Sequence, residues 1–245
     1  MSCFPNIKAN SYKKPIKAPQ SYNNNEINLN EEMIDTFNED SKCKTLETIL
    51  GACKDEFLLV FNRPLEEDAE LVIDKNGFKT YGQDCNNGFL LKSSFFSEAD
   101  PETFLSYLTD TGTRQKWDKN IEKITKVALA PHIDMIYTRF TKFFAISQRD
   151  LLTITRCYKD DSGYFLISTS YENQEFPVDQ NIMRIQIFIA GYFIQSLNGG
   201  SKVFAVTQGN FGGILPQKAM RTTVAMSFHK FQMSMETAMA KKIKS

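Results

Sequence analysis

Residues 110–124, DTGTRQKWDKNIEKI, place charged side chains beside the only tryptophan of the chain. Arg114 and Asp118 are four residues apart, so a helix would present both on one face. On a solvated surface this spacing adds only ~0.2–0.5 kcal/mol to helix stability. In a buried position the guanidinium would need an anion, and its fork fits a phosphate well. The residues alone leave a solvated ion pair and an anion-binding site as alternatives.

Trp117 lies between these two charges in the sequence. A tryptophan ring buries a large apolar area, so a structural role in a core is the simplest interpretation. We therefore expect Trp117 to anchor the end of a helix and to fix Arg114 and Asp118 there.

Four more polar residues occur in strand-like segments near the carboxyl end. Arg184 and Gln186 alternate with Phe188, and Gln208 and Asn210 alternate on a later segment. A strand points every second side chain to the same face, so each set is expected to share a face. A buried polar group without a partner costs ~1–3 kcal/mol. These residues are predicted either to contact a ligand headgroup or to form a satisfied internal network.

The patterns that support catalysis, metal binding or nucleic-acid binding are missing from the sequence. The two histidines, His132 and His229, are far apart, and no GxSxG, HExxH or nucleotide-binding glycine loop occurs. The five cysteines form no CxxC pair, which fits neither a zinc site nor a disulfide framework. The net charge is zero, whereas nucleic-acid binding needs a basic surface. The sequence predicts no enzyme, no metal, no cofactor and a reducing, cytoplasmic compartment.

The elements that hold these residues begin after a polar segment. Residues 1–40 are predicted to be a disordered tail, with a short helix near EEMIDTF, because they contain too little apolar surface to fold. Residues 41–245 are predicted to be one globular domain. No apolar run approaches the ~18–20 residues of a transmembrane helix, and the first ten residues lack the apolar core of a signal peptide.

The globular part alternates helical and strand patterns in a clear order. A helix capped by Ser41 is expected first, then a hairpin turning at 75–77, and a helix that starts at Asp100-Pro101. After Trp117 come strands joined by short turns, among them one continuous strand from IMRIQ to FIQSL, which favour an antiparallel meander. A last helix begins at Pro216 with apolar residues at helical spacing. The predicted fold class is α+β.

The order of these elements and several local strings resemble the START domain, the steroidogenic-acute-regulatory-related lipid-transfer family. TRQKWDKNIEKI resembles its Arg-x-x-Trp-Asp stretch, SQRDL its Ser-x-Arg-Asp strand start, and GGSKVFAVTQGNFGGILP its last strand and turn. The likeness covers about residues 42–240, and it is strongest to phosphatidylcholine-transfer members of the family.

The resemblance implies a helix-grip fold, in which a curved antiparallel sheet grips the long last helix around a tunnel for one lipid. It places Arg114 at the lipid phosphate. Within that fold we expect a polar headgroup site of Arg114, Asp118, Arg184, Gln186, Gln208 and Asn210, of which only Arg114 is carried over from the family, and a tunnel lined by Thr138, Leu151, Phe188 and Tyr192. The implied membrane-contacting lid contains Phe143, Phe144, Ile146, Met220 and Val224.

The sequence departs from the phosphatidylcholine-transfer pattern at the aromatic cage that holds choline. The corresponding positions carry Thr138, Leu151 and Phe188, so only one ring remains. Tyr137, Tyr192 or Phe140 could supply other rings. A different phospholipid or a broad specificity is therefore an equal alternative.

Three functions follow from this sequence. The first is a monomeric, non-enzymatic carrier that moves one lipid, preferably a phospholipid, between membranes with transient contact to their surfaces. The second is a lipid sensor whose charged tail docks a partner protein. The third is a helix-grip enzyme, a cyclase or hydrolase, that uses Asp118 as a base.

Overall fold

The computed structural model describes the backbone of residues 31–64, 66–142 and 147–243, and the side chains of this part from Asp40 to Lys241. One compact unit runs from Glu39 to Ser245. The elements are α1 (Glu31–Phe61), β1 (Glu70–Lys75), β2 (Phe78–Cys85), β3 (Gly88–Ser97), α2 (Pro101–Thr109), α3 (Thr111–Trp117), β4 (Ile121–Ala130), β5 (Ile133–Phe140), β6 (Arg149–Asp160), β7 (Gly163–Ser170), β8 (Met183–Arg184), β9 (Gln186–Leu197), β10 (Gly200–Asn210) and α4 (Gln217–Ile243).

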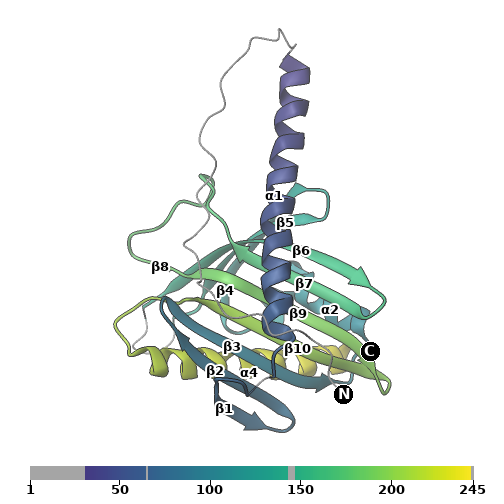
Figure 1. The fold of residues 1–245 in the computed structure, drawn as a ribbon, viewed down its shortest axis with the longest axis vertical. Coiled ribbons are helices and arrows are strands. Elements are labelled where there is room, and N and C mark those ends of the chain that lie inside the picture. The colour runs from purple at the N-terminus through teal and green to yellow at the C-terminus, as the bar shows by residue number, and fades with distance from the viewer. Residues whose placement is uncertain (1–30, 65, 143–146, 244–245) are drawn as a thin grey trace, which may run out of the picture. The chain divides into compact units, whose positions relative to one another are not determined.

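The strands form one sheet in the order β1-β2-β3-β10-β9-β7-β6-β5-β4, and neighbours along this path are antiparallel (Figure 1). The short β8 lies off the path and pairs with β6 in parallel. The path consists of two meanders, β1-β2-β3 and β4-β5-β6-β7-β9-β10, which are joined where β3 pairs with β10. This α+β, helix-grip architecture confirms the predicted fold class.

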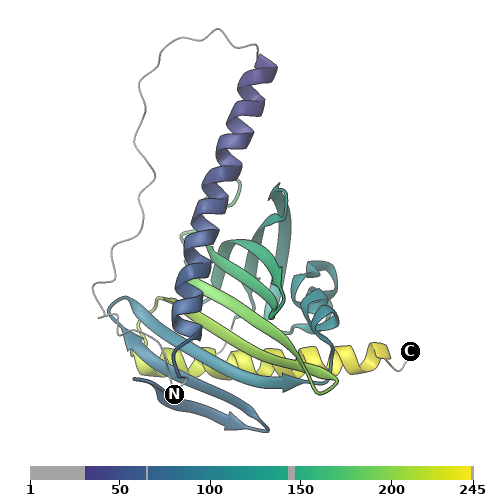
Figure 2. The ribbon, with the colours of Figure 1, turned by 45° about the vertical axis from the view of Figure 1, so that its right-hand side comes forward.

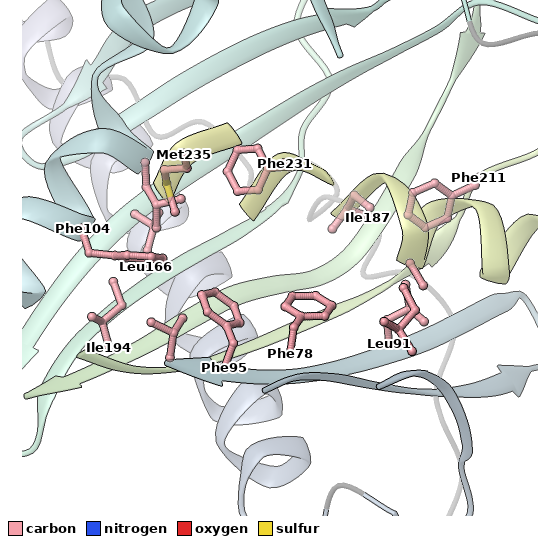
Figure 3. Close-up of a cluster of buried hydrophobic side chains, with 14 of the residues drawn as sticks. Phe78, Leu91, Phe95, Phe104, Leu166, Ile187, Ile194, Phe211, Phe231 and Met235 are labelled. Carbon is pink, nitrogen blue, oxygen red and sulfur yellow. The ribbon is translucent and has the colours of Figure 1, made fainter. Parts of the chain in front are cut away.

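Two apolar layers cover the two faces of the sheet. On one face, here called the inner face, α4 and α2 pack against β2, β3 and β9 (Figure 2). Phe231 and Met235 of α4 lie opposite Phe78 and Phe95 of the sheet (Figure 3). On the outer face, α1 buries residues such as Phe57 against β7 and β9. Both faces are therefore apolar, and polar residues that point to either face need a partner.

Local sequence signals account for several element ends. Asn76 and Gly77 take positive φ values of 50° and 78° in the β1–β2 turn, as a tight hairpin requires. The carboxylate of Asp100 accepts the backbone N–H groups of Glu102 and Thr103, and Pro101 is the first residue of α2. The predictions of this hairpin and of this helix start are confirmed.

Two element boundaries differ from the sequence-based prediction. The first helix begins at Glu31, so Ser41 lies inside α1 and is not its cap. The segment predicted as one strand from Ile182 to Leu197 is divided into β8 and β9. The strand is divided because β8 pairs with β6, whereas β9 pairs with β7, so the chain moves from one neighbouring strand to another between them. Of the predicted tail at residues 1–40, residues 1–30 lie outside the described residues, and residues 31–40 form the first part of α1.

Candidate functional site

The short helix α3 positions the charged pair. Asp110 begins it by accepting the N–H groups of Gly112 and Thr113 at 3.0 and 3.2 Å. It ends at Trp117, and the N–H of Asp118 donates to the carbonyl of Arg114 at 2.9 Å. One helical turn therefore separates Arg114 from Asp118, as their spacing predicted.

Arg114 and Asp118 form a largely buried ion pair. The distance from Arg114 Nε to Asp118 Oδ2 is 3.5 Å, and the side chains are 24% and 3% exposed. The guanidinium lies over the ring of Phe231 at 5.0 Å from its centroid. The alternative of a fully solvated pair does not hold, because Asp118 is buried.

Two buried donors at this pair lack a hydrogen-bond acceptor among the described residues. They are Arg114 Nε and the indole Nε1 of Trp117. An unsatisfied buried donor costs ~1–3 kcal/mol, and more when it is charged. Arg114 Nε lies 3.5 Å from Asp118 Oδ2 without forming a hydrogen bond, so the ion pair leaves this donor unsatisfied.

Aromatic rings connect this pair to the last helix. Trp117 lies 5.4 Å from Phe231 and 6.4 Å from Tyr107 between ring centroids. Phe231 stacks on Phe228 at 6.0 Å, and Phe228 meets Tyr192 of β9 at 6.1 Å. Trp117 anchors α3 as expected, and its main partner belongs to α4.

Tyr192 brings a third polar group to the pair. Burial raises the pKa of its hydroxyl to about 12; the carboxylate of Asp118 also raises it, and the guanidinium of Arg114 lowers it. Tyr192 packs against the inner cluster, so it lies on the inner face, and its hydroxyl remains neutral at physiological pH.

The centre of the inner face is lined by small side chains. Thr155 of β6, Ser168 of β7, Ala190 of β9 and Thr207 of β10 form one row across neighbouring strands. Alternation from Leu151, Leu166 and Val203, all packed in the inner cluster, directs this row inward. This row of small residues was not predicted from the sequence. The even spacing between Leu151 and Thr155 indicates that both lie on the same face of β6.

Two more of the predicted tunnel residues share this face. Thr138 of β5 pairs with Leu151 of β6, which packs in the inner cluster. Thr138 itself is buried. Phe140 also packs on the inner cluster, whereas Tyr137 packs with Met135 in a separate cluster. Of the alternative cage rings, Tyr192 and Phe140 therefore lie on the inner face and Tyr137 does not.

Arg184 and Gln186 do not join this site. Arg184 donates to both carboxylate oxygens of Asp150 at 2.7 and 2.9 Å and lies over the ring of Tyr137. Gln186 is exposed. Arg184 therefore belongs to a satisfied internal network, which was one of the two alternatives. The prediction that Arg184 and Gln186 face a tunnel together with Phe188 is wrong.

Phe188 and Gln208 both lie on the outer face, Phe188 because of a β-bulge and Gln208 because it alternates with the outer residue Val206. The pairing of β9 with β10 shifts between Gln208 and Gly209, which reverses the alternation expected from the sequence. Phe188 packs against the cluster under α1, and Gln208 pairs with Leu90 and Ile189 of that cluster. Asn210 donates to Asn87 and accepts the N–H of Gly212, so it stabilises a turn.

The predicted lid residues are only partly described. Phe143, Phe144 and Ile146 lie outside the described residues. Met220 is buried and Val224 is half-buried. Both side chains pack on the inner cluster, so neither lies on the solvent-exposed face of α4. Their placement in an outward membrane contact is corrected, because α4 uses this face to pack on the sheet.

Arg149 ties the start of β6 to the loop between β10 and α4. Its guanidinium donates to the carbonyls of Ser147, Phe211 and Gly212. Burial lowers its pKa from the ordinary value. Gly213 takes φ 97°, and a side chain there would meet Arg149. Arg149 is thus a structural residue of the loop between β10 and α4.

Comparisons with known proteins agree with this fold. The START domain family matches residues 67–243. This chain belongs to the START domain family. START domain-containing protein 10 of mouse and of human is 26% identical over 118 residues, which are 47% of this chain and 40% of each relative. The match thus spans well under half of the length of these curated relatives.

Solved START structures show the same fold at low sequence identity. Human StAR-related lipid transfer protein 5 superposes with a TM-score of 0.75 at 16% identity and covers 82% of this chain and 99% of its own. Human STARD10 gives 0.66 at 21% identity, covering 73% and 76%. Within the described residues, no helix is long and apolar enough to span a bilayer.

Proposed function

We propose that this START protein binds one phospholipid on the inner face of its sheet and carries it between membranes. The observation that carries the proposal is the pair of unsatisfied donors, Arg114 Nε and Trp117 Nε1, beside the buried Asp118. A phosphate oxygen accepts from both kinds of donor, and a guanidinium binds phosphate with a fork geometry. Membership of the START family, and the likeness in fold to a human protein named for lipid transfer, support a lipid as the ligand.

The charge of the site favours a zwitterionic headgroup. Arg114 and Asp118 together are neutral, and the hydroxyl of Tyr192 is uncharged. A zwitterionic lipid keeps the enclosed site neutral, with its phosphate at Arg114 and its ammonium group toward Asp118. An anionic lipid would leave one uncompensated charge in a poorly solvated place, which is costly. Tyr192 and Phe228 add aromatic faces for the ammonium group.

The acyl chains have an apolar place beneath α4. The row of Thr155, Ser168, Ala190 and Thr207 contributes little side-chain volume to the inner face, which α4 also lines with aromatic rings and methionines. Each buried CH₂ group contributes ~0.8 kcal/mol to transfer from water. Methionine side chains are unbranched and adaptable, so α4 can repack when a lipid enters.

The loop before α4 and the solvent face of α4 are suited to a transient membrane contact. Ile214 is fully exposed, and Leu215 is 40% exposed. On α4, Met226 and Met233 are exposed by 49% and 45%. The helix carries five Lys and Arg residues, of which Lys218 and Arg221 pair with Glu70 and Asp84, and a single acidic residue, Glu236. Exposed apolar groups beside basic ones bind an anionic lipid surface.

The proposal is tested by transfer of labelled phospholipids between liposomes. We expect the purified protein to accelerate transfer of a zwitterionic phospholipid and to return it chemically intact. A modified lipid would support the enzyme alternative with Asp118 as base. Transfer of sterol alone would contradict the headgroup assignment. Unchanged lipid without transfer would favour the sensor alternative, in which the protein holds its lipid and binds a partner protein.

A further inference from the structure

A cavity lies on the outer face of the sheet, away from the proposed lipid site. It has a volume of about 200 Å³ and lies where the end of α1 meets β3 and β10. Its apolar wall includes Val60, Phe61, Phe204 and Val206, and its polar residues include Arg63 and Lys92. Phe61 and Phe204 meet edge to face at 5.2 Å.

Lys92 is the unusual member of this wall. It lies on β3 between β2 and β10, and it is only 4% exposed. Its ammonium group donates to the carbonyl of Pro64. An ammonium group has three donors, so two remain without a protein acceptor among the described residues.

The charges around Lys92 do not compensate it at contact distance. Its pKa is lowered because burial disfavours the charged form, and Arg63 lowers it further. Glu66, Glu67 and Asp68 act in the opposite direction, but they are exposed, and none forms an ion pair with Lys92. A buried cation that has only a carbonyl partner is costly, and a bound anion would remove that cost.

We propose that this outer cavity is a binding site for a small carboxylate with an apolar body. Lys92 binds the carboxylate group, and the rings of Phe61 and Phe204 contact the apolar body. The volume fits a single aromatic ring with its carboxylate, because a cavity of ~150 Å³ already accommodates benzene. The occupant is distinct from the transported lipid, since the two sites lie on opposite faces of the sheet.

Benzoate and benzamide are the matched probes for this site. They share one shape, and only benzoate carries a charge. In methyl NMR of the whole protein, we expect saturable benzoate shifts at Val60 and Val206, with benzamide binding at least about tenfold more weakly, as the loss of one charge-assisted hydrogen bond implies. Inorganic phosphate, which lacks an apolar body, is expected to bind more weakly than benzoate.

Lys92→Met tests the role of the ammonium group directly. We expect this variant to lose the preference for benzoate, while Lys202→Met retains it. Lys202 is a suitable control because it lies over the ring of Phe204 at 5.5 Å and does not line the cavity. If Lys92→Met fails to fold, the comparison of benzoate with benzamide in the wild type still decides. Equal affinity for both probes, benzoate shifts confined to the inner face, or phosphate binding as tight as benzoate would overturn the proposal.

Discussion

Neutralising the buried pair at α3 gives the sharpest mutational test of the lipid site. Removal of Arg114 alone would leave Asp118, which is 3% exposed, without its cation, and such a loss costs ~3–5 kcal/mol of stability. The double variant Arg114→Gln, Asp118→Asn avoids this penalty because it removes both charges and keeps similar side-chain volumes. Its fold is checked by circular dichroism and urea unfolding.

The expected effect follows from the unsatisfied donors. A hydrogen bond to a charged group contributes ~1.5–3 kcal/mol, so loss of one such bond to a lipid phosphate weakens binding roughly 10- to 150-fold. We expect phospholipid extraction from liposomes to fall by this amount in the double variant. Arg114→Lys keeps a charge opposite Asp118 but loses the fork, so its extraction should lie between those of the wild type and the double variant.

A matched pair elsewhere in the chain serves as the control. Arg156 has the same exposure as Arg114, 24%, binds Glu47 at 2.9 Å and lies over the ring of Tyr158 at 5.1 Å. The variant Arg156→Gln, Glu47→Gln should extract lipid like the wild type. The reasoning is refuted if the Arg114–Asp118 variant is folded and extracts phospholipid as well as this control does.

Three further predictions concern stability, packing and membrane contact. The pKa of Tyr192 is raised to about 12, above the ~10 of an unfolded tyrosine, so the neutral hydroxyl stabilises the fold fully below pH ~10 and this contribution is lost as the pH rises toward 12. In urea unfolding, Tyr192→Phe should therefore lose less stability than the wild type between pH ~10 and about 12. An equal loss of stability in both proteins would contradict this prediction. Trp117→Ala should lower the free energy of unfolding by ~3 kcal/mol because its ring packs on Phe231, and a loss below ~1 kcal/mol would show that it is no anchor. Ile214→Asp should weaken liposome binding about tenfold without loss of stability, because the Ile214 side chain is fully exposed. The control variant Leu59→Asp, on the exposed side of α1, should bind liposomes like the wild type. Equal liposome binding by the two variants would exclude Ile214 from the membrane contact.

Local sequence signals predicted several elements of the fold and the pairing of Arg114 with Asp118. The turn at Asn76-Gly77 and the cap at Asp100 are encoded within a few residues, so the hairpin and α2 could be placed without tertiary information. The spacing of Arg114 and Asp118 is likewise local, and the structure pairs them. These features depend on one turn of chain, which the sequence specifies directly.

Features that depend on contacts between distant residues could not be predicted in the same way. The bulge opposite Gln208 moves Phe188 to the outer face, and no residue type in β9 predicts this bulge. Arg184 is occupied by Asp150, which is 34 residues away and is brought near by the parallel pairing of β8 with β6. The alternation of residues in this segment therefore predicted strands correctly, but it assigned Phe188 and Arg184 to the wrong side of the sheet.

Native mass spectrometry tests the central claim most directly. The protein is incubated with liposomes that contain phosphatidylcholine, phosphatidylethanolamine, phosphatidylserine and cholesterol in equal amounts, and is then separated from them. We predict a complex of one protein with one intact zwitterionic phospholipid, and its loss in the variant Arg114→Gln, Asp118→Asn. A complex with cholesterol alone, or a phospholipid complex that persists unchanged in this variant, would contradict the proposed site.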